Sequence, residues 1–170
     1  AKHRIIWLLV LMISATFTGG IIRKFENVLQ SVVALTAFIP MLMDTGGNSG
    51  SQSSTLVIRG LALGEIELKD AGRVMWKEFR ISIIVGIVLA VVNFFRICLF
   101  DDVGVLVALT VSITLLITVM VSKVVGGILP IIAKKINLDP AIMAGPLITT
   151  IVDALSLMVY FSIASLLLNI

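Results

Sequence analysis

Cysteine, histidine and charged residues are all scarce in this chain. Its 170 residues include one cysteine, Cys98, and one histidine, His3. A single cysteine cannot form a disulfide within the chain, and one residue of each kind cannot build a Cys/His metal site. Only 14% of the residues are Asp, Glu, Lys or Arg. Typical soluble domains carry about 25%, so this chain has too little charge to cover the surface of a soluble protein.

Groups for catalysis or nucleic-acid binding are equally sparse. No nucleophile paired with a base and no catalytic metal motif stands out, so we do not expect an enzyme. The sequence pI of 9.3 is basic, but we attribute it to membrane flanks that meet anionic lipid headgroups. Nucleic acid is therefore not an expected partner, whereas membrane lipid is.

Long apolar runs dominate what remains. Hydrophobic residues make up 59% of the chain, and its mean hydropathy is +1.16. Lipid permits only helices or closed barrels, and these runs lack the alternation of barrel strands. Since a spanning helix takes about 20 residues, we predict an all-α membrane protein with a bundle of five transmembrane helices. The whole chain, 1–170, is expected to be one pore domain with spans at about 5–22, 28–60, 80–99, 103–133 and 140–168.

The span at 28–60 is expected to be a broken helix. After Pro40, residues 44–54 contain three glycines and many small polar side chains. Irregular backbone at membrane depth is tolerated only inside protein or beside a water-filled cavity. An extramembrane loop between two short helices is the alternative, but it would leave two apolar pieces too short to span.

The apolar stretch from 103 to 133 is long for one span. We expect Lys123 to extend its amine to the cytoplasmic face, and the helix to kink or break near Gly127 and Pro130. Asp139 is a plausible N-cap for the last span, with Pro140 in its first position. Before the third span, the charged residues of 65–80 suit an amphipathic helix at the membrane surface, and Glu78 could turn into the bundle.

Orientation follows from counting Lys and Arg in alternate flanks. One side would hold Lys2, Arg4, Arg59, Lys69, Arg73, Lys77, Arg80, Lys123, Lys134 and Lys135, and the other only Arg23, Lys24 and Arg96. Cytoplasmic flanks carry the excess of basic residues. We therefore expect a multi-pass membrane protein, with a cytoplasmic N-terminus and the C-terminus outside. Because the first span begins almost at Ala1, we also expect a soluble part to precede it.

Asp153 is the single charged residue of the last 30 positions. A carboxylate at mid-membrane costs roughly 2.5 to 3.5 kcal/mol on insertion scales, and such groups usually mark an ion or substrate path. Spacings of three and four residues put it on one helix face with Gly145, Thr149, Ser156 and Tyr160. The hydroxyls could instead bond only to their own helix, and Asp153 could be protonated or paired with Lys123.

The candidate ligands are oxygen atoms. Pro146 has no N–H, so the carbonyl of Ile142 loses its helical donor and is free to coordinate water or a hydrated ion. Carboxylate, amide, hydroxyl and carbonyl oxygens favour Mg²⁺ or Ca²⁺ over softer metals. One deep carboxylate is little for a divalent ion, whereas a symmetric dimer would offer two around an axial pore.

Three sequence runs resemble the MgtE magnesium channels, which are similar to the eukaryotic solute-carrier magnesium transporters. They are Pro40 with the glycine-rich run Gly46-Gly47-Asn48-Ser49-Gly50-Ser51-Gln52-Ser53, the triplet Asp139-Pro140-Ala141, and the run Gly145-Pro146-Leu147-Ile148-Thr149-Thr150-Ile151-Val152-Asp153. Together these runs extend over most of the chain. The glycine-rich run and the run that ends in Asp153 are specific in combination.

The resemblance implies a homodimer of five-span subunits with its pore at the dimer interface, lined by the second and fifth spans. It implies that Asp153 of both subunits holds hydrated Mg²⁺, with further contacts from Gly145, Thr149 and Asn48. It also implies pore-lining positions at Gly46, Gly47, Gln52, Pro146 and Ser156, and acidic residues at the cytoplasmic mouth, Asp139 for gating and Glu78. The resemblance further implies a location in the bacterial inner (plasma) membrane. Family members carry cytosolic N-terminal and CBS domains that are absent from this sequence.

Three functions remain open at this point. A magnesium channel would move Mg²⁺ into the cytoplasm down its electrochemical gradient. An ion-coupled exchanger for divalent cations with the same fold would show proton-dependent flux. A non-conducting membrane anchor would tolerate Asp153→Asn, but it would explain neither the deep carboxylate nor the glycine-rich run.

Overall fold

The computed structural model describes residues 2–143 and 146–169, and every regular element in those ranges is helical. In chain order the elements are α1 (Lys2–Lys24), α2 (Glu26–Ser31), the 3₁₀ helix η1 (Val33–Phe38), α3 (Ile39–Ala62), the 3₁₀ helix η2 (Leu68–Asp70), α4 (Ala71–Phe100), α5 (Val105–Lys135), the 3₁₀ helix η3 (Pro140–Met143) and α6 (Pro146–Leu168). The predicted all-α class is confirmed.

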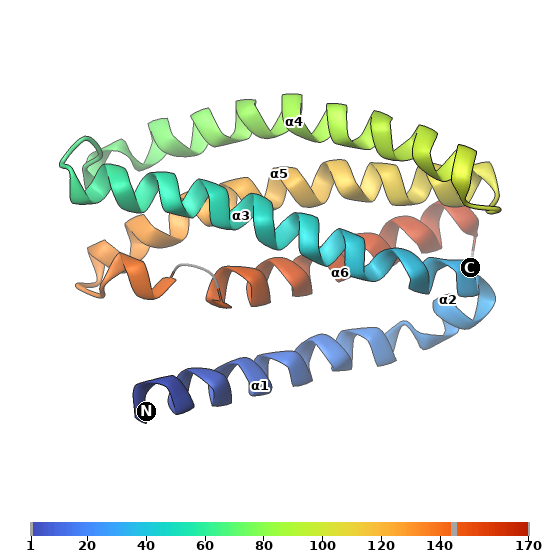
Figure 1. Ribbon diagram of the computed structural model, residues 1–170, viewed down its shortest axis with the longest axis horizontal. Helices are drawn as coiled ribbons and strands as arrows, with labels where there is room; N and C mark the ends of the chain where they lie inside the picture. The colour runs from blue at the N-terminus through green and yellow to red at the C-terminus, as the bar shows by residue number, and fades with distance from the viewer. Residues whose placement is uncertain (1, 144–145, 170) are drawn as a thin grey trace.

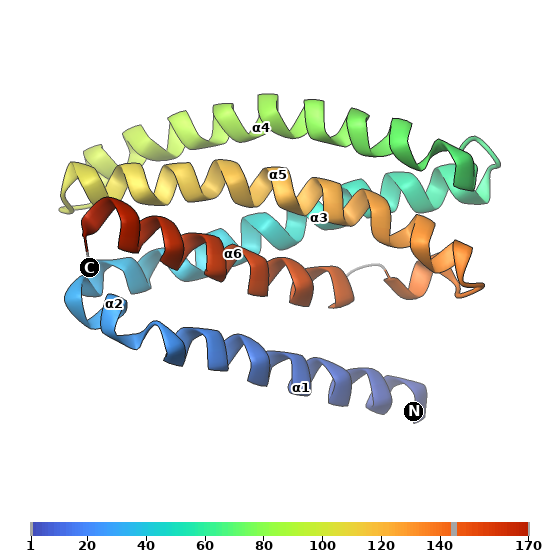
Figure 2. The same ribbon diagram turned by 180° about the vertical axis from the view of Figure 1, so that it is seen from behind.

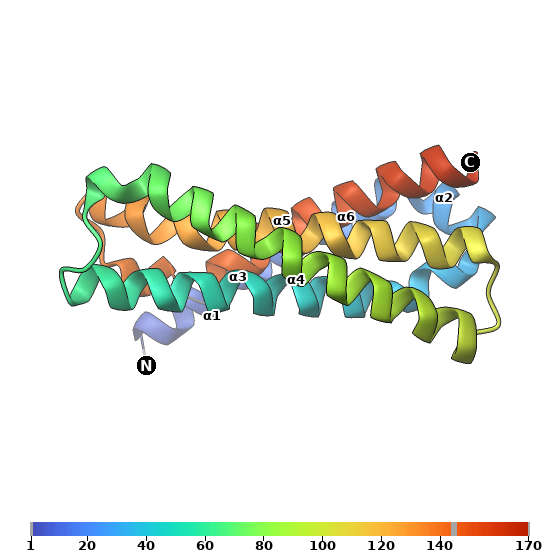
Figure 3. The same cartoon turned by 90° about the horizontal axis from the view of Figure 1, so that it is seen from above.

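The long helices form an up-and-down bundle (Figure 1). The helices α3, α4, α5 and α6 alternate in direction along the chain. α5 lies in the middle, in contact with the other three. The view from above shows α4 and α5 crossing along their length (Figure 3). At one end lie the connections from α3 to α4 and from α5 to α6, and at the other lie α2, the turn between α4 and α5, and the end of α6 (Figure 1).

Three helices are long and apolar enough to cross a membrane among the described residues. They cover Leu68–Phe100, Val105–Lys135 and Pro146–Leu168. α3 lacks this uniform hydrophobicity, and α1 packs against α6 while its N-terminal part diverges from the bundle (Figure 2). The count of five spans stays a prediction.

The apolar core is divided between the two ends of the bundle. A larger cluster at the α2 end includes Leu35, Leu42, Val111 and Phe161. A smaller one at the opposite end consists of Val57, Leu61, Val74 and Ile131. Between them the buried positions of α3 and α5 are mainly glycine, serine and threonine, for example Gly50 and Ser122. Small residues allow backbones to approach closely in the membrane, so the middle of the bundle is held by close helix contact.

The glycine-rich run does not interrupt its helix, contrary to the expectation of a broken helix over residues 44–54. α3 is continuous from Ile39 to Ala62, and the interruption lies earlier, at Val32 and the 3₁₀ turn that follows it. Glycine costs a helix roughly 1 kcal/mol per residue. Here that cost is offset because the glycines face other helices at distances that no larger residue allows.

α5 also runs without a break through Gly127 and Pro130. Its orange end turns away from the line of its first half, as the views in Figures 1 and 2 show. The prediction allowed a kink or a break; the break is absent, and the last part of α5 changes direction. The last span starts later than predicted: η3 covers Pro140–Met143, and α6 begins at Pro146.

Candidate ion pathway

The crossing of α3 and α6 is built on glycine. A Cβ atom at Gly46 would lie 2.8 Å from a methyl group of Val152, and one at Gly47 would lie 3.0 Å from a methyl group of Thr149. Both glycines are buried. Gly46 and Gly47, which the resemblance assigns to the pore lining, therefore bring the α3 backbone against α6.

The other side of α3 carries a stripe of exposed polar side chains. We call it the polar stripe and define it as Asp44, Asn48, Gln52, Thr55 and Arg59, all exposed. Their spacings of three and four residues keep them on one face of the helix. Four of the residues around a hollow of about 720 Å³ on this face are polar: Asn48, Ser51, Gln52 and Thr55. Asn48 and Gln52 are thus open to the surroundings of the subunit, as their predicted roles require.

Thr149 and Asp153 lie along one edge of the polar stripe. The side chain of Thr149 meets α3 at Gly47, the residue before Asn48. Since α6 runs antiparallel to α3, Asp153 follows one helical turn further, toward the level of Asp44. Asp153 is partly exposed, so its carboxylate can be reached from outside the subunit.

The start of α6 carries two more predicted residues. Pro146 is exposed at the first position of the helix. Its carbonyl oxygen accepts hydrogen bonds from the hydroxyls of Thr149 and Thr150, each at 2.9 Å. Thr149 therefore bonds to its own helix, an alternative that the sequence left open. Gly145 lies outside the described residues.

Ser156 and Tyr160, from the same predicted face, are packed inside the subunit. The Ser156 hydroxyl is buried and donates to the carbonyl oxygen of Val152 at 2.6 Å. The Tyr160 hydroxyl donates to the carbonyl oxygen of Leu35 at 2.9 Å. The Tyr160 bond fixes α6 against η1, whereas the Ser156 bond stays within α6. Thr149 and Asp153 are left as the partly exposed polar residues of that face.

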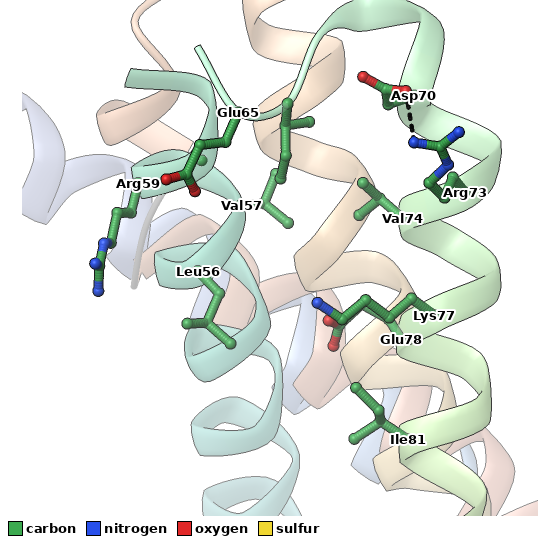
Figure 4. A pocket seen from close by; sticks show the side chains of 12 residues that line it. Leu56, Val57, Arg59, Glu65, Asp70, Arg73, Val74, Lys77, Glu78 and Ile81 are labelled. Carbon is green, nitrogen blue, oxygen red and sulfur yellow. Dashed lines mark ion pairs between the residues drawn. The ribbon is translucent and has the colours of Figure 1, made fainter. Parts of the chain in front are cut away.

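Glu78 turns into the bundle, as its position suggested. Its side chain is 5% exposed, and it accepts a hydrogen bond from the Ser53 hydroxyl at 2.5 Å. Gly127 of α5 makes room for it, because a Cβ there would lie 3.2 Å from the Glu78 Cγ. Glu78 also borders a hollow of about 440 Å³ between α3 and α4 (Figure 4). Asp139, by contrast, is exposed and accepts from the backbone N–H of Ala141 at 2.9 Å, which caps η3.

Lys123 was predicted to extend its amine to the cytoplasmic face, but its side chain is buried. It is only 6% exposed, because α5 is enclosed by α3, α4 and α6 and leaves its side chains little access to the membrane face. Within the described part of the chain, no carboxylate oxygen lies within 4.0 Å of its ammonium group. A pair between Lys123 and Asp153 is therefore not formed in this conformation.

One subunit offers few ligands for a metal ion. Over residues 2–143 and 146–169 no three His, Cys, Asp or Glu side chains come close enough to hold one together. Asp153 is the one carboxylate in the partly exposed middle of α6. A dehydrated ion would lack partners here, so a divalent ion at Asp153 needs its own water shell or a second subunit.

Comparison with known proteins decides the family. The family model for MgtE, described as a divalent cation transporter, matches residues 39–163. This chain belongs to the MgtE family. The magnesium transporter MgtE of Bacillus subtilis is 40% identical over 97% of the chain, and that of Thermus thermophilus is 36% identical over 98%. In each case the chain spans 36% of the relative's length.

Membership in the MgtE family agrees with two predictions. Members are membrane transporters of divalent cations, Mg²⁺ in particular, and they are not enzymes. Asp44 and Thr55 have no predicted role, and the structure adds them to the exposed polar face. Asp44 lies four residues before Asn48, and Thr55 lies three residues after Gln52. These helical spacings were a signal that could have identified both residues.

Proposed function

We propose that this chain forms the pore of a magnesium channel that conducts hydrated Mg²⁺ into the cytoplasm. The observation that carries the proposal is the polar stripe. A spanning helix cannot expose carboxylate, amide and hydroxyl groups to hydrocarbon without a cost of several kcal/mol. Water or a second subunit must therefore cover this face of α3.

A homodimer satisfies this requirement. If the polar stripes of two subunits face each other, a water-filled path runs between them, with Asn48, Gln52 and Thr149 along it and the two Asp153 carboxylates at one level. Such a pair would hold Mg²⁺ through its water shell, since Mg²⁺ gives up water reluctantly. Backbone oxygens near Gly145 and Thr149 would supply further contacts.

Direction follows from charge. The end of the bundle with the α3 to α4 and α5 to α6 connections carries Arg59, Arg73, Lys77, Lys134 and Lys135, which favours the cytoplasmic side. Asp139 and Glu78 belong to this end and would form the cytoplasmic mouth. An inside-negative potential of 100 mV favours entry by about 2.3 kcal/mol per charge, and by about twice that for Mg²⁺.

The test is Mg²⁺ uptake by the protein reconstituted in liposomes at an inside-negative potential, read with a Mg²⁺-sensitive dye inside the vesicles. Asp153→Asn keeps the shape of the side chain and removes its charge. We expect uptake to fall at least tenfold, because one lost charged contact of about 1.4 kcal/mol or more corresponds to that factor.

Asp102→Asn is the matched control. Asp102 is exposed in the turn between α4 and α5, and its substitution should leave uptake unchanged. Unchanged uptake in Asp153→Asn, with folding and oligomeric state intact, would reject Asp153 as the ion site. Uptake that depends on a proton gradient would instead establish the exchanger.

A further inference from the structure

The N-terminal part of α4 carries a basic cluster on the outer surface of the bundle. Arg73, Lys77 and Arg80 are exposed, and their spacings of four and three residues place them on one helix face. They line a hollow of about 530 Å³ together with Trp76 and the isoleucines at 81, 83 and 84, and none of the described residues that line it is acidic.

The charges of this cluster are mostly uncompensated. Arg73 lies 3.7 Å from Asp70, in an ion pair that leaves its own side chain 86% exposed (Figure 4). Lys77 and Arg80 make no ion pair within 4.0 Å to any residue that the structure describes. Glu78, their neighbour in sequence, is buried and bonded to Ser53. The cluster therefore presents a net positive charge to its surroundings.

An apolar strip continues from this cluster along the same face of α4. Its members are large exposed hydrophobic side chains: Ile84, Ile87, Val88, Val91, Val92 and Phe95. At about 1.5 Å per residue, the strip from Ile84 to Phe95 is about 16 Å long. That is close to half of the roughly 30 Å hydrocarbon core, the depth reached by the acyl chains of one leaflet.

We propose that this face of α4 binds an anionic phospholipid. The phosphate group would lie among Arg73, Lys77 and Arg80, with Trp76 at the level of the headgroup and one acyl chain along the strip that starts at Ile84. Basic side chains attract anionic headgroups, and tryptophan favours the membrane interface. The hollow between α3 and α4 is a poorer anion site, because Glu65, Asp70 and Glu78 balance its three basic residues.

The test uses the protein in phosphatidylcholine vesicles with spin-labelled lipids. The electron spin resonance spectrum gives the fraction of labelled lipid immobilised by the protein, for phosphatidylglycerol and for phosphatidylcholine. One basic residue near a membrane surface corresponds to a factor of about five in affinity. We expect phosphatidylglycerol to be preferred by about fivefold or more.

The triple variant Arg73→Gln, Lys77→Gln, Arg80→Gln should abolish this preference. The matched control, Arg59→Gln, Lys134→Gln, Lys135→Gln, removes three charges from the same end of the bundle and should retain it. Circular dichroism of each variant in the neutral vesicles verifies its helical content. The proposal is overturned if the wild type shows no preference, if the triple variant keeps it, or if both variants lose it equally.

Discussion

The exposed faces of α3 and α4 differ in chemistry although the two helices follow each other in the chain and both pack on α5. α4 exposes a continuous row of aliphatic and aromatic side chains, from Ile84 to Phe95. α3 exposes the polar stripe, from Asp44 to Arg59, and buries its glycines. Side chains exposed on the surface of a single subunit can therefore suit two different surroundings. The face of α4 suits lipid, whereas the face of α3 requires water or protein.

The same contrast exists between the two sides of α3. Its buried side touches α5 and α6 through glycine and serine, and its exposed side holds larger polar groups that make few contacts within the subunit. Changes on the buried side should alter stability, and changes on the exposed side should alter transport. The next three predictions test that division, from the largest expected effect on stability to the smallest.

Gly126→Ala should have the largest effect. A Cβ at this position would collide with the carbonyl oxygen of Gly50, and two backbones can avoid each other only if α3 and α5 separate. Overpacking of this kind costs about 3 kcal/mol. Thermal unfolding followed by circular dichroism in detergent should show a markedly lower midpoint, and Mg²⁺ uptake should fall as well.

Gly20→Ala is the matched control for that change. Gly20 lies within α1, and nothing lies within 4 Å of a Cβ placed there. Alanine in a helix interior is favoured over glycine by about 0.5 to 1 kcal/mol, so this variant should be slightly more stable than the wild type. If Gly126→Ala unfolded at the same temperature as Gly20→Ala, the close contact of α3 and α5 would be refuted.

Ser53→Ala should have an intermediate effect. It removes the hydroxyl that donates to Glu78 at 2.5 Å and leaves a buried carboxylate oxygen without that partner. Such a loss costs about 2 kcal/mol, measurable by the same thermal unfolding. Ser51→Ala, two residues earlier and on the side of α3 nearer the polar stripe, should change the midpoint little. Equal effects of the two substitutions would mean that the sides of α3 do not differ in their contribution to stability.

The smallest change in stability is expected from placing a polar side chain on the exposed apolar face of α4 and an apolar side chain in the polar stripe of α3. Val91→Asn places an amide in the exposed apolar row of α4 and should cost about 1 kcal/mol without blocking transport. Asn48→Leu places an apolar group in the polar stripe and should leave stability unchanged while lowering Mg²⁺ uptake. Uptake assays and unfolding midpoints for both variants decide the matter. Normal uptake by Asn48→Leu would show that this face does not line the ion path.

The helices and the family were accessible from the sequence because hydrophobicity and local motifs determine both. The apolar runs located the cores of α4, α5 and α6, and the glycine-rich run together with the run ending in Asp153 indicated MgtE. The turn of Glu78 into the bundle was also anticipated, whereas Asp139 caps η3 and not the last span, for which it was predicted. These features depend on residues close in sequence or on the cost of charge in lipid.

Structural features that depend on residues distant in the sequence could not be predicted from it. Residues 44–54 have poor helix propensity, yet they are helical because Gly46, Gly47 and Gly50 meet α5 and α6. Lys123 is buried because three helices enclose α5, which no local pattern reveals. The residue spacing puts Ser156 on the same helix face as Asp153, but the packing of α6 against α3 buries Ser156 inside the subunit.

Pro130 allows α5 to bend at the place where α5 contacts α3. α5 is the longest helix in the described ranges, at 31 residues, and Gly126 is the point where it meets Gly50. Proline at 130 supplies no N–H to the carbonyl of Gly126, four residues earlier. At that residue α5 can bend without breaking a backbone hydrogen bond. The close contact of α5 with α3 at Gly126 therefore coincides with a point where α5 can bend, so that the end of α5 leading to Asp139 can tilt while the half beside the larger core stays in place.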